Sequence, residues 1–278
     1  MNFFVTVLGS GSALPTGSRH CSGQVVNIGG FRFLLDCGEA TQTQIRVYRQ
    51  RLQSIGHIFL THLHGDHFFG LPGLVSTMHL CGRTEPLDIY APAGVQVAME
   101  TFLSAAGSHI GYEIRYHELD FAEGCRLIFE NRHCRISAFP LVHSVPTYGY
   151  VIDQMPREPG LPGITPPAPL RYAYCTDTAY TETILPFIAG ANLLCMESTF
   201  DDAFASVAAE KLHSTSRQAA TLALKAGVGQ LMLTHISARF KDTTQLLAQA
   251  QEVFPNTLLA ADGERYEVLG SRELRVEN

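Results

Sequence analysis

The sequence contains no apolar stretch long enough to span a membrane, because glycine, proline or polar residues interrupt its longest apolar runs. Charged residues make up only 17% of the 278 residues, and the formal net charge is −6 at pH 7. A charge of this size neither recruits nor excludes a nucleic acid, so any contact with a polyanion must depend on local patches. Residues 1–8 lack the basic flank and small-residue cleavage site of a signal peptide. We therefore expect a cytoplasmic protein with no membrane partner.

The cysteines form no C-x-x-C pair, and their odd number argues against a disulfide framework. Scattered single thiols are typical of a reducing compartment, and none of them lies in a setting that favours a nucleophile. The seven positions are Cys21, Cys37, Cys81, Cys125, Cys134, Cys175 and Cys195.

A dinucleotide-binding loop is also excluded. Gly9 and Gly11 follow the first predicted strand, but Leu14 occupies the place of the third glycine in the pattern G-x-G-x-x-G. We expect a tight turn there instead. There is no internal repeat, and with 46% hydrophobic residues the chain can bury a sizeable core. Residues 1–278 are therefore expected to form a single domain.

The segment T-H-L-H-G-D-H at residues 61–67 directly follows an apolar run that we expect to be a strand. It brings four metal-competent side chains, His62, His64, Asp66 and His67, within six residues of one another. Imidazole and carboxylate groups together suit zinc or a similar divalent ion. His62 and His64 can face one ion, whereas Asp66 and His67 can turn toward a second. The spacing predicts a two-metal hydrolase of phosphoryl or acyl groups. The alternative is a histidine-rich surface loop.

Three more candidate ligands, His143, Asp177 and His235, each follow an apolar run that is expected to be a strand. A single histidine after a strand is usually structural or exposed to solvent. Three such positions together would complete the coordination of two ions, with Asp177 as a bridge. Because Thr178 follows Asp177, this aspartate could instead be the N-cap of a helix.

Glu197 ends a strand that is predicted to be buried, where an unpaired carboxylate would be unfavourable. His213 is a candidate partner, which Glu197 would orient and keep protonated as a general acid for a departing oxygen. The alternative is that Ser214 or Ser216 caps the following helix and that His213 has no special role. The sequence alone does not separate the two.

The remaining pattern predicts strands and helices that alternate along both halves of the chain. Two facing mixed sheets flanked by helices, with the site at their shared edge, fit this order. Residues 154–169 contain six prolines and are expected to form an extended surface loop. We expect strands at 3–8, 24–28, 31–36, 57–60, 87–91, 125–130, 133–142, 172–175, 192–197, 230–234, 257–261 and 266–269, and helices at 39–52, 72–81, 92–106, 216–226 and 243–254, with another after Thr178.

The chain resembles the ribonuclease Z family of transfer-RNA 3′-processing endoribonucleases, within the metallo-β-lactamase fold superfamily. The H-x-H-x-D-H segment alone indicates only the superfamily. The more specific matches are L-G-S-G-S-A-L-P-T from Leu8, L-D-C-G-E from Leu35, T-H-L-H-G-D-H-F-F-G-L-P-G-L from Thr61, E-S-T-F from Glu197, H-S-T from His213 and L-T-H-I-S-A-R-F from Leu233. Similarity covers almost the whole length and preserves the order of the motifs.

The resemblance implies an α+β fold, a four-layer αββα sandwich, with two zinc ions per subunit, or Mn²⁺ or another divalent ion in their place. One ion would be held by His62, His64 and His143, and the other by Asp66, His67 and His235, with Asp177 bridging them. Asp66 would also act as the general base, and Glu197 and His213 would assist protonation of the leaving group.

The implied reaction is the removal of the 3′ trailer from precursor transfer RNA, by attack of a metal-activated hydroxide after the discriminator nucleotide. The implied assembly is a homodimer. Many family members carry a long arm that clamps the transfer RNA. Only residues 154–169 occupy its place here, so we expect an arm that is either naturally reduced or partly missing from this sequence. The shorter arm keeps a second function open, the hydrolysis of small phosphodiesters or other small-molecule esters. A catalytically inactive RNA-binding scaffold is a weaker third hypothesis, because all seven ligand positions are filled.

Overall fold

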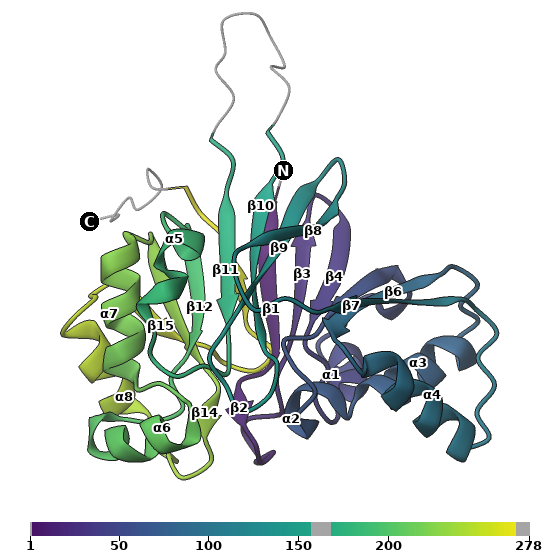
Figure 1. Cartoon of the computed structure of the whole chain (residues 1–278), viewed down its shortest axis with the longest axis horizontal. Helices are drawn as coiled ribbons and strands as arrows, with labels where there is room; N and C mark the ends of the chain where they lie inside the picture. The colour runs from purple at the N-terminus through teal and green to yellow at the C-terminus, as the bar shows by residue number, and fades with distance from the viewer. Residues whose placement is uncertain (1, 157–167, 271–278) are drawn as a thin grey trace, which may run out of the picture.

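The computed structural model describes residues 2–156 and 168–270, and its centre consists of two seven-stranded sheets that face each other (Figure 1). In spatial order, the first sheet contains β16 (Arg265–Glu267), β1 (Phe3–Gly9), β3 (Gly23–Ile28), β4 (Phe31–Leu35), β5 (Ile55–Phe59), β6 (Leu87–Pro92) and β7 (Ile114–Leu119). The second contains β15 (Thr257–Leu259), β13 (Gln230–Thr234), β12 (Leu193–Glu197), β11 (Arg171–Cys175), β10 (Tyr148–Gln154), β9 (Cys134–Pro140) and β8 (Arg126–Glu130). A small parallel pair, β2 (Gly11–Ser12) and β14 (Ile236–Ser237), joins them at one end.

Helices cover the outer face of each sheet, which confirms the predicted αββα layering (Figure 1). On the first sheet lie α1 (Thr41–Val47), α2 (Gly65–Phe68), α3 (Leu71–Leu80) and α4 (Val95–Ala105), with the 3₁₀ turn η1 (Leu52–Ser54). On the second lie α5 (Leu185–Ile188), α6 (Ala205–Lys211), α7 (Ser216–Ala226) and α8 (Thr244–Gln251), with the turns η2 (Glu182–Ile184) and η3 (Asp202–Phe204). No helix in these described ranges is long and apolar enough to cross a membrane.

The core between the sheets is rich in aromatic side chains and almost completely buried. Tyr150, Tyr172 and Tyr174 of the second sheet face Phe33 and Phe59 of the first, and each of the five is at most 1% exposed. Alternate residues of the strands point into this layer, while the intervening residues pack against the outer helices. The buried apolar surface therefore holds the two sheets in a fixed relation to each other.

The strand directions explain why the candidate site residues meet. Strands β4 to β7 run parallel to one another, and so do β11, β12, β13 and β15. The carboxyl ends of parallel strands lie at the same edge of a sheet, where ligands commonly bind. The loops that follow β5, β11, β12 and β13 consequently open at one end of the sandwich, beside the β2–β14 pair.

Most predicted elements are present, and three differences are informative. The helix expected at 39–52 is shorter, because the chain leaves α1 after Val47 and Arg49 adopts a left-handed backbone with φ 53°. The prediction did not include β10 or α6. Gln154 belongs to β10 instead of the proline-rich loop, and residues 157–167 of that loop lie outside the described residues.

The cysteines are unpaired, as predicted. All seven lie within the described ranges as free thiols, five of them buried and two, Cys81 and Cys125, exposed.

Candidate active site

Three histidines from two separate loops form the first ligand group. His62 and His64 come from the loop after β5, and His143 comes from the loop after β9. The His64 Nδ1 atom lies 3.0 Å from His62 Nε2 and 3.3 Å from His143 Nε2. Two nitrogens bound to a tetrahedral zinc ion at 2.0–2.1 Å stand about 3.3 Å apart. The spacing of these ring nitrogens therefore fits a common ion.

The second ligand group combines Asp66, His67 and His235. His67 Nε2 lies 3.3 Å from His235 Nε2, and Asp66 Oδ2 lies 3.4 Å from His235 Nε2 and 3.6 Å from His67 Nε2. His235 follows β13 directly and has a left-handed backbone with φ 58°, which turns the chain from β13 into β14. His67 and His235 are buried, whereas Asp66 is only partly covered. The Asp66 carboxylate therefore borders the open side of the site.

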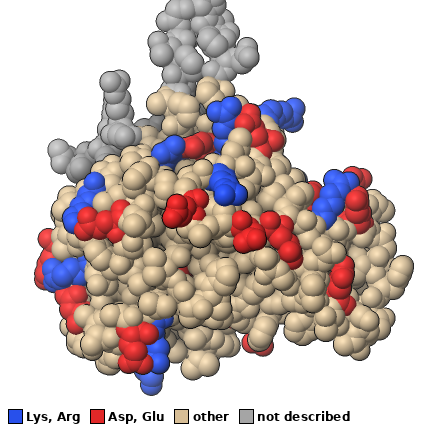
Figure 2. Space-filling view, viewed as in Figure 1, with Lys and Arg blue, Asp and Glu red and all other residues tan. Residues whose placement is uncertain are grey.

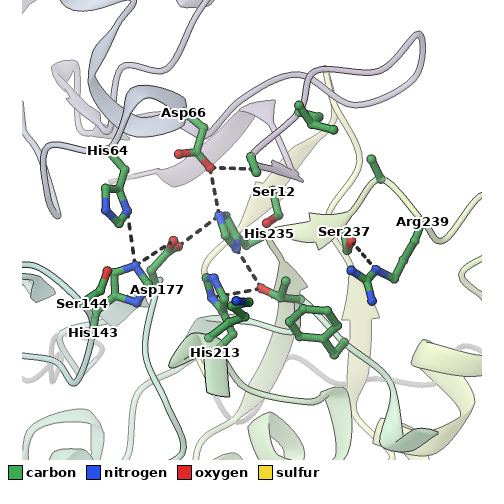
Figure 3. Close-up of a pocket in the computed structure, with 16 residues that line it drawn as sticks. Ser12, His64, Asp66, His143, Ser144, Asp177, His213, His235, Ser237 and Arg239 are labelled. Carbon is green, nitrogen blue, oxygen red and sulfur yellow. Dashed lines mark hydrogen bonds and ion pairs between the residues drawn. The ribbon is translucent and has the colours of Figure 1, made fainter. Parts of the chain in front are cut away.

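Asp177 lies between the two groups, as a bridging ligand would (Figure 3). Its Oδ2 atom faces the first group, 3.7 Å from His62 Nε2 and 3.8 Å from His143 Nε2. Its Oδ1 atom faces the second, 3.3 Å from His67 Nε2 and 3.1 Å from His235 Nε2. All seven predicted ligands thus converge, and the surface-loop alternative for residues 61–67 is wrong.

The outer nitrogens of four of these rings are held by hydrogen-bonding groups. The partner of His67 Nδ1 is Asp36 Oδ2, and the other three rings contact Thr61, Leu212 and Thr199. Ligand histidines in metal sites are commonly oriented in this way, because the bond fixes the tautomer and aims the opposite nitrogen at the ion. The pairs are His62 Nδ1 with Thr61 Oγ1 at 3.0 Å, His67 Nδ1 with Asp36 Oδ2 at 2.9 Å, His143 Nδ1 with Leu212 O at 3.1 Å and His235 Nδ1 with Thr199 Oγ1 at 2.9 Å. The side chains therefore fit a pair of divalent ions.

Asp36 is a site residue to which the sequence reasoning gave no role. Its fully buried carboxylate accepts hydrogen bonds from the Thr61 backbone N–H at 2.8 Å and from the Tyr174 hydroxyl at 2.9 Å, besides its contact with His67. The only signal in the sequence is its place at the end of a strand, in L-D-C-G-E. Asp36 connects the loop of residues 61–67 to the second sheet through Tyr174.

Replacing Asp36 with asparagine should weaken metal binding by about 10- to 100-fold, as loss of such an outer partner does elsewhere. The amide keeps the shape but loses the charge that stabilises the ring orientation of His67. Titration with zinc or manganese measures the change. Asp153→Asn, which alters a carboxylate paired with Arg171 far along β10, is the matched control and should bind metal like the wild type. Equal affinity in both variants would contradict this role.

Glu197 and His213 form the predicted pair. Glu197 is completely buried at the end of β12, and its Oε1 atom lies 3.0 Å from His213 Nδ1. The carboxylate also accepts hydrogen bonds from Thr199 Oγ1 at 2.6 Å and from the Ser214 backbone N–H at 3.0 Å. Burial alone would lower the pKa of His213, but the charge of Glu197 and the hydrogen bond to it prevail and raise that pKa to about 9.

The capping alternatives for these residues are wrong. Thr215 is the N-cap of α7 and forms a capping box with Gln218, so neither Ser214 nor Ser216 has that role. Ser214 instead donates from its backbone to Glu197. Thr181, and not Asp177, caps the next helical turn, η2. Asp177 and Ser214 are therefore not occupied as helix caps.

A cavity of about 370 Å³ opens over the ligand groups (Figure 3). One part of its wall carries Lys211 and Arg239. The Arg239 guanidinium lies 4.8 Å from the ring centres of both Phe200 and Phe204, which hold it by cation–π contacts. The cavity can therefore accept an anionic group beside the candidate ligands.

Comparisons with known proteins identify the family of the chain. Residues 31–236 match the family described as a β-lactamase superfamily domain. Ribonuclease Z of Parabacteroides distasonis is 36% identical over an alignment of 303 positions, which covers 96% of this chain and 99% of that protein. Ribonuclease Z of Synechococcus sp. (strain WH7803) is also 36% identical, covering 93% of this chain and 94% of that protein.

A solved structure shows the same relation in three dimensions. The human tRNase Z, short form, superposes with a TM-score of 0.79 and 30% identity, covering 96% of this chain and 100% of that one. Its agreement extends over both sheets. The chain belongs to the ribonuclease Z family of the metallo-β-lactamase fold superfamily.

Proposed function

We propose that this protein is an endoribonuclease that removes the 3′ trailer from precursor transfer RNA. It hydrolyses the phosphodiester after the discriminator nucleotide and leaves a 3′-hydroxyl on the transfer RNA and a 5′-phosphate on the trailer. The observation that carries the proposal is the convergence of seven ligand-type side chains beside the Glu197–His213 pair, in a chain with ribonuclease Z relatives over nearly its whole length. Such a site suits phosphodiester hydrolysis.

We propose His62, His64 and His143 as the ligands of one zinc ion and Asp66, His67 and His235 as those of the other, with Asp177 shared. Mn²⁺ or another divalent ion would fit the same nitrogen and oxygen donors. A bound pair of such ions supplies an activated water at neutral pH and neutralises charge that develops on the phosphoryl oxygens.

The residues around these positions supply orientation and protons. The Ala13 backbone N–H donates to Asp66 Oδ2 at 2.7 Å, which holds the carboxylate toward the cavity, where it can accept a proton from the attacking water. His213 is partly buried against Glu197 and lines the same cavity. His213 donates its proton to the 3′-oxygen as that oxygen leaves. Asp66 and His213 thus border one cavity, which Asp177 lines as well.

The pH dependence of turnover should reveal the proton on His213. Because its pKa is raised to about 9, activity should fall as the pH rises through that value. Glu197→Gln removes the charge that raises the pKa, so the alkaline limb should move down by about two units or more, toward or below the ordinary histidine value. Profiles of kcat between pH 6 and 10 measure the shift. An unchanged limb in this variant would contradict the assignment of the acid.

Mapping the ends of the products tests the function directly. The purified protein, with zinc or manganese added, should cut a 3′-extended transfer RNA at one position and leave the termini described above. The Asp66→Ala variant should leave the precursor intact while still binding it. Turnover of a generic phosphodiester with no cutting of the precursor at any protein concentration would instead favour a hydrolase of small phosphodiesters.

Four properties belong to the same proposal. We expect a homodimer, a single domain over residues 1–278, a cytoplasmic location, and a reduced arm in the interval between β10 and β11. Strand β10 ends at Gln154 and β11 begins at Arg171, so the interval between them is short. We expect the reduced arm to leave the chemistry intact and to lower the affinity for precursor transfer RNA.

A further inference from the structure

Two phenylalanines lie beside the loop of residues 61–67, here called the catalytic loop, and are exposed to solvent. Phe69, directly after α2, is 61% exposed, and Phe102, on α4, is 48% exposed. Their ring centres lie 6.5 Å apart with the planes at 63°, and the buried ring of Phe68 contacts both from below. These contacts hold the two exposed rings as one platform. Clustered exposed aromatic rings often mark a binding surface.

The platform adjoins the candidate ligands directly. Gly65 lies between His64 and Asp66, and the ring of Phe69 covers it so closely that a Cβ on Gly65 would stand 2.5 Å from a ring carbon. One side of the Phe69 ring therefore packs on the catalytic loop while the rest remains open to solvent. A group resting on this ring would be next to a phosphodiester held by the catalytic loop.

Charge identifies the kind of group that the platform accepts. The helices around it, α2, α3 and α4, contain no lysine or arginine, and Glu100 lies two residues before Phe102. On the face shown in Figure 2, basic and acidic side chains are interspersed without a continuous basic area. This part of the surface is therefore unsuited to phosphate, whereas an aromatic ring can stack with any base.

We propose that Phe69 and Phe102 form a stacking platform for an unpaired nucleotide next to the scissile phosphodiester of the RNA. The inference rests on the proposed function, which brings RNA to the cavity. Stacking on aromatic rings contributes about 1–3 kcal/mol per base and requires no positive charge. A second copy of this chain is the competing occupant of the same apolar surface.

Variants of the platform test the proposal on the full-length protein. Phe102→Ala and Phe69→Leu should raise the KM for precursor transfer RNA and its Kd by about tenfold, with bound metal unchanged and kcat within about twofold. Phe102→Tyr keeps the ring and should behave like the wild type. Leu224→Ala removes a similarly exposed apolar side chain from α7, on the other sheet, and is the matched control. The slope of affinity against salt concentration should not change, because no phosphate contact is lost.

Three results would overturn the platform. The first is an unchanged KM and Kd in both Phe102→Ala and Phe69→Leu. The second is a change of these variants to a smaller species in sedimentation that fully accounts for their lost RNA affinity. The two rings would then bind a second copy of the chain. The third is an equal loss in Phe102→Tyr. If the wild type does not cut the precursor, the proposed function fails, and the Kd measured by filter binding still tests the platform.

Discussion

Replacing Asp177 with alanine should reduce cleavage of precursor transfer RNA by at least about a thousandfold, because the side chain is shared between both candidate ions. Its two oxygens face four histidine nitrogens from different parts of the chain. Without this carboxylate, the two ions would repel each other unshielded, and each would lose a ligand. A divalent ion held by these residues would lower the pKa of a water molecule from about 16 toward about 7, so its loss would remove the nucleophile at neutral pH. Assays at saturating RNA, together with metal analysis of the purified protein, measure both effects.

The position, and not the mere loss of a carboxylate, should decide this result. Asp153→Ala removes an aspartate from β10 that is paired with Arg171 and partly exposed, so it should change neither turnover nor bound metal. Asp177→Asn keeps the volume of the side chain and should also lose activity. Full metal content and normal turnover in Asp177→Ala would remove the basis of the proposed two-ion site.

His213→Ala is expected to lower kcat by about 10²- to 10⁴-fold, the usual effect of losing a general acid. Its imidazole is held by Glu197 and lies in the cavity beside the candidate ligands. The 3′-oxygen would then leave as an unprotonated alkoxide, which is a poor leaving group. Cleavage of a precursor under single-turnover conditions measures the loss of the chemical step alone.

A change of the leaving atom separates this role from a structural one. In a precursor with sulfur in place of the 3′-oxygen at the scissile bond, this sulfur leaves as a thiolate. The thiolate needs no proton to leave, because thiols have a pKa near 8.5. His213→Ala should therefore cut this substrate at nearly the wild-type rate, while Asp177→Ala should not recover. An equal defect on both substrates would show that His213 supports the fold or the ions instead of the leaving group.

The ligand set was predictable from the sequence because its members follow buried strands, and parallel strands present their carboxyl ends at one edge. His62, Asp177 and His235 each come after an apolar run that forms a strand of the sandwich. The Glu197–His213 contact could not be derived in the same way. It depends on Thr215 capping α7, which leaves the backbone of Ser214 free to bind Glu197.

Other parts of the site were beyond sequence reasoning for physical reasons. Asp36 looks like the polar end of a strand, and only the tertiary structure brings Thr61, His67 and Tyr174 to its carboxylate. The backbone of Asp36 is left-handed with φ 56°, and an aspartate does not by itself predict this conformation, although aspartate adopts it more often than most other non-glycine residues. Helix α1 ends early because Arg49 also adopts a left-handed backbone, which an arginine in the sequence does not predict.

The origin of the ligands from both sheets has a consequence for assembly of the protein. Four come from the loop after β5 and three from loops that follow strands of the second sheet. The bound cations would therefore act as cross-links between the two halves, and their binding energy would add to the free energy of unfolding. A nascent chain that stops before residue 235 would lack one of these ligands. Full metal loading would thus report that the chain has been synthesised past His235 and that both sheets have folded together.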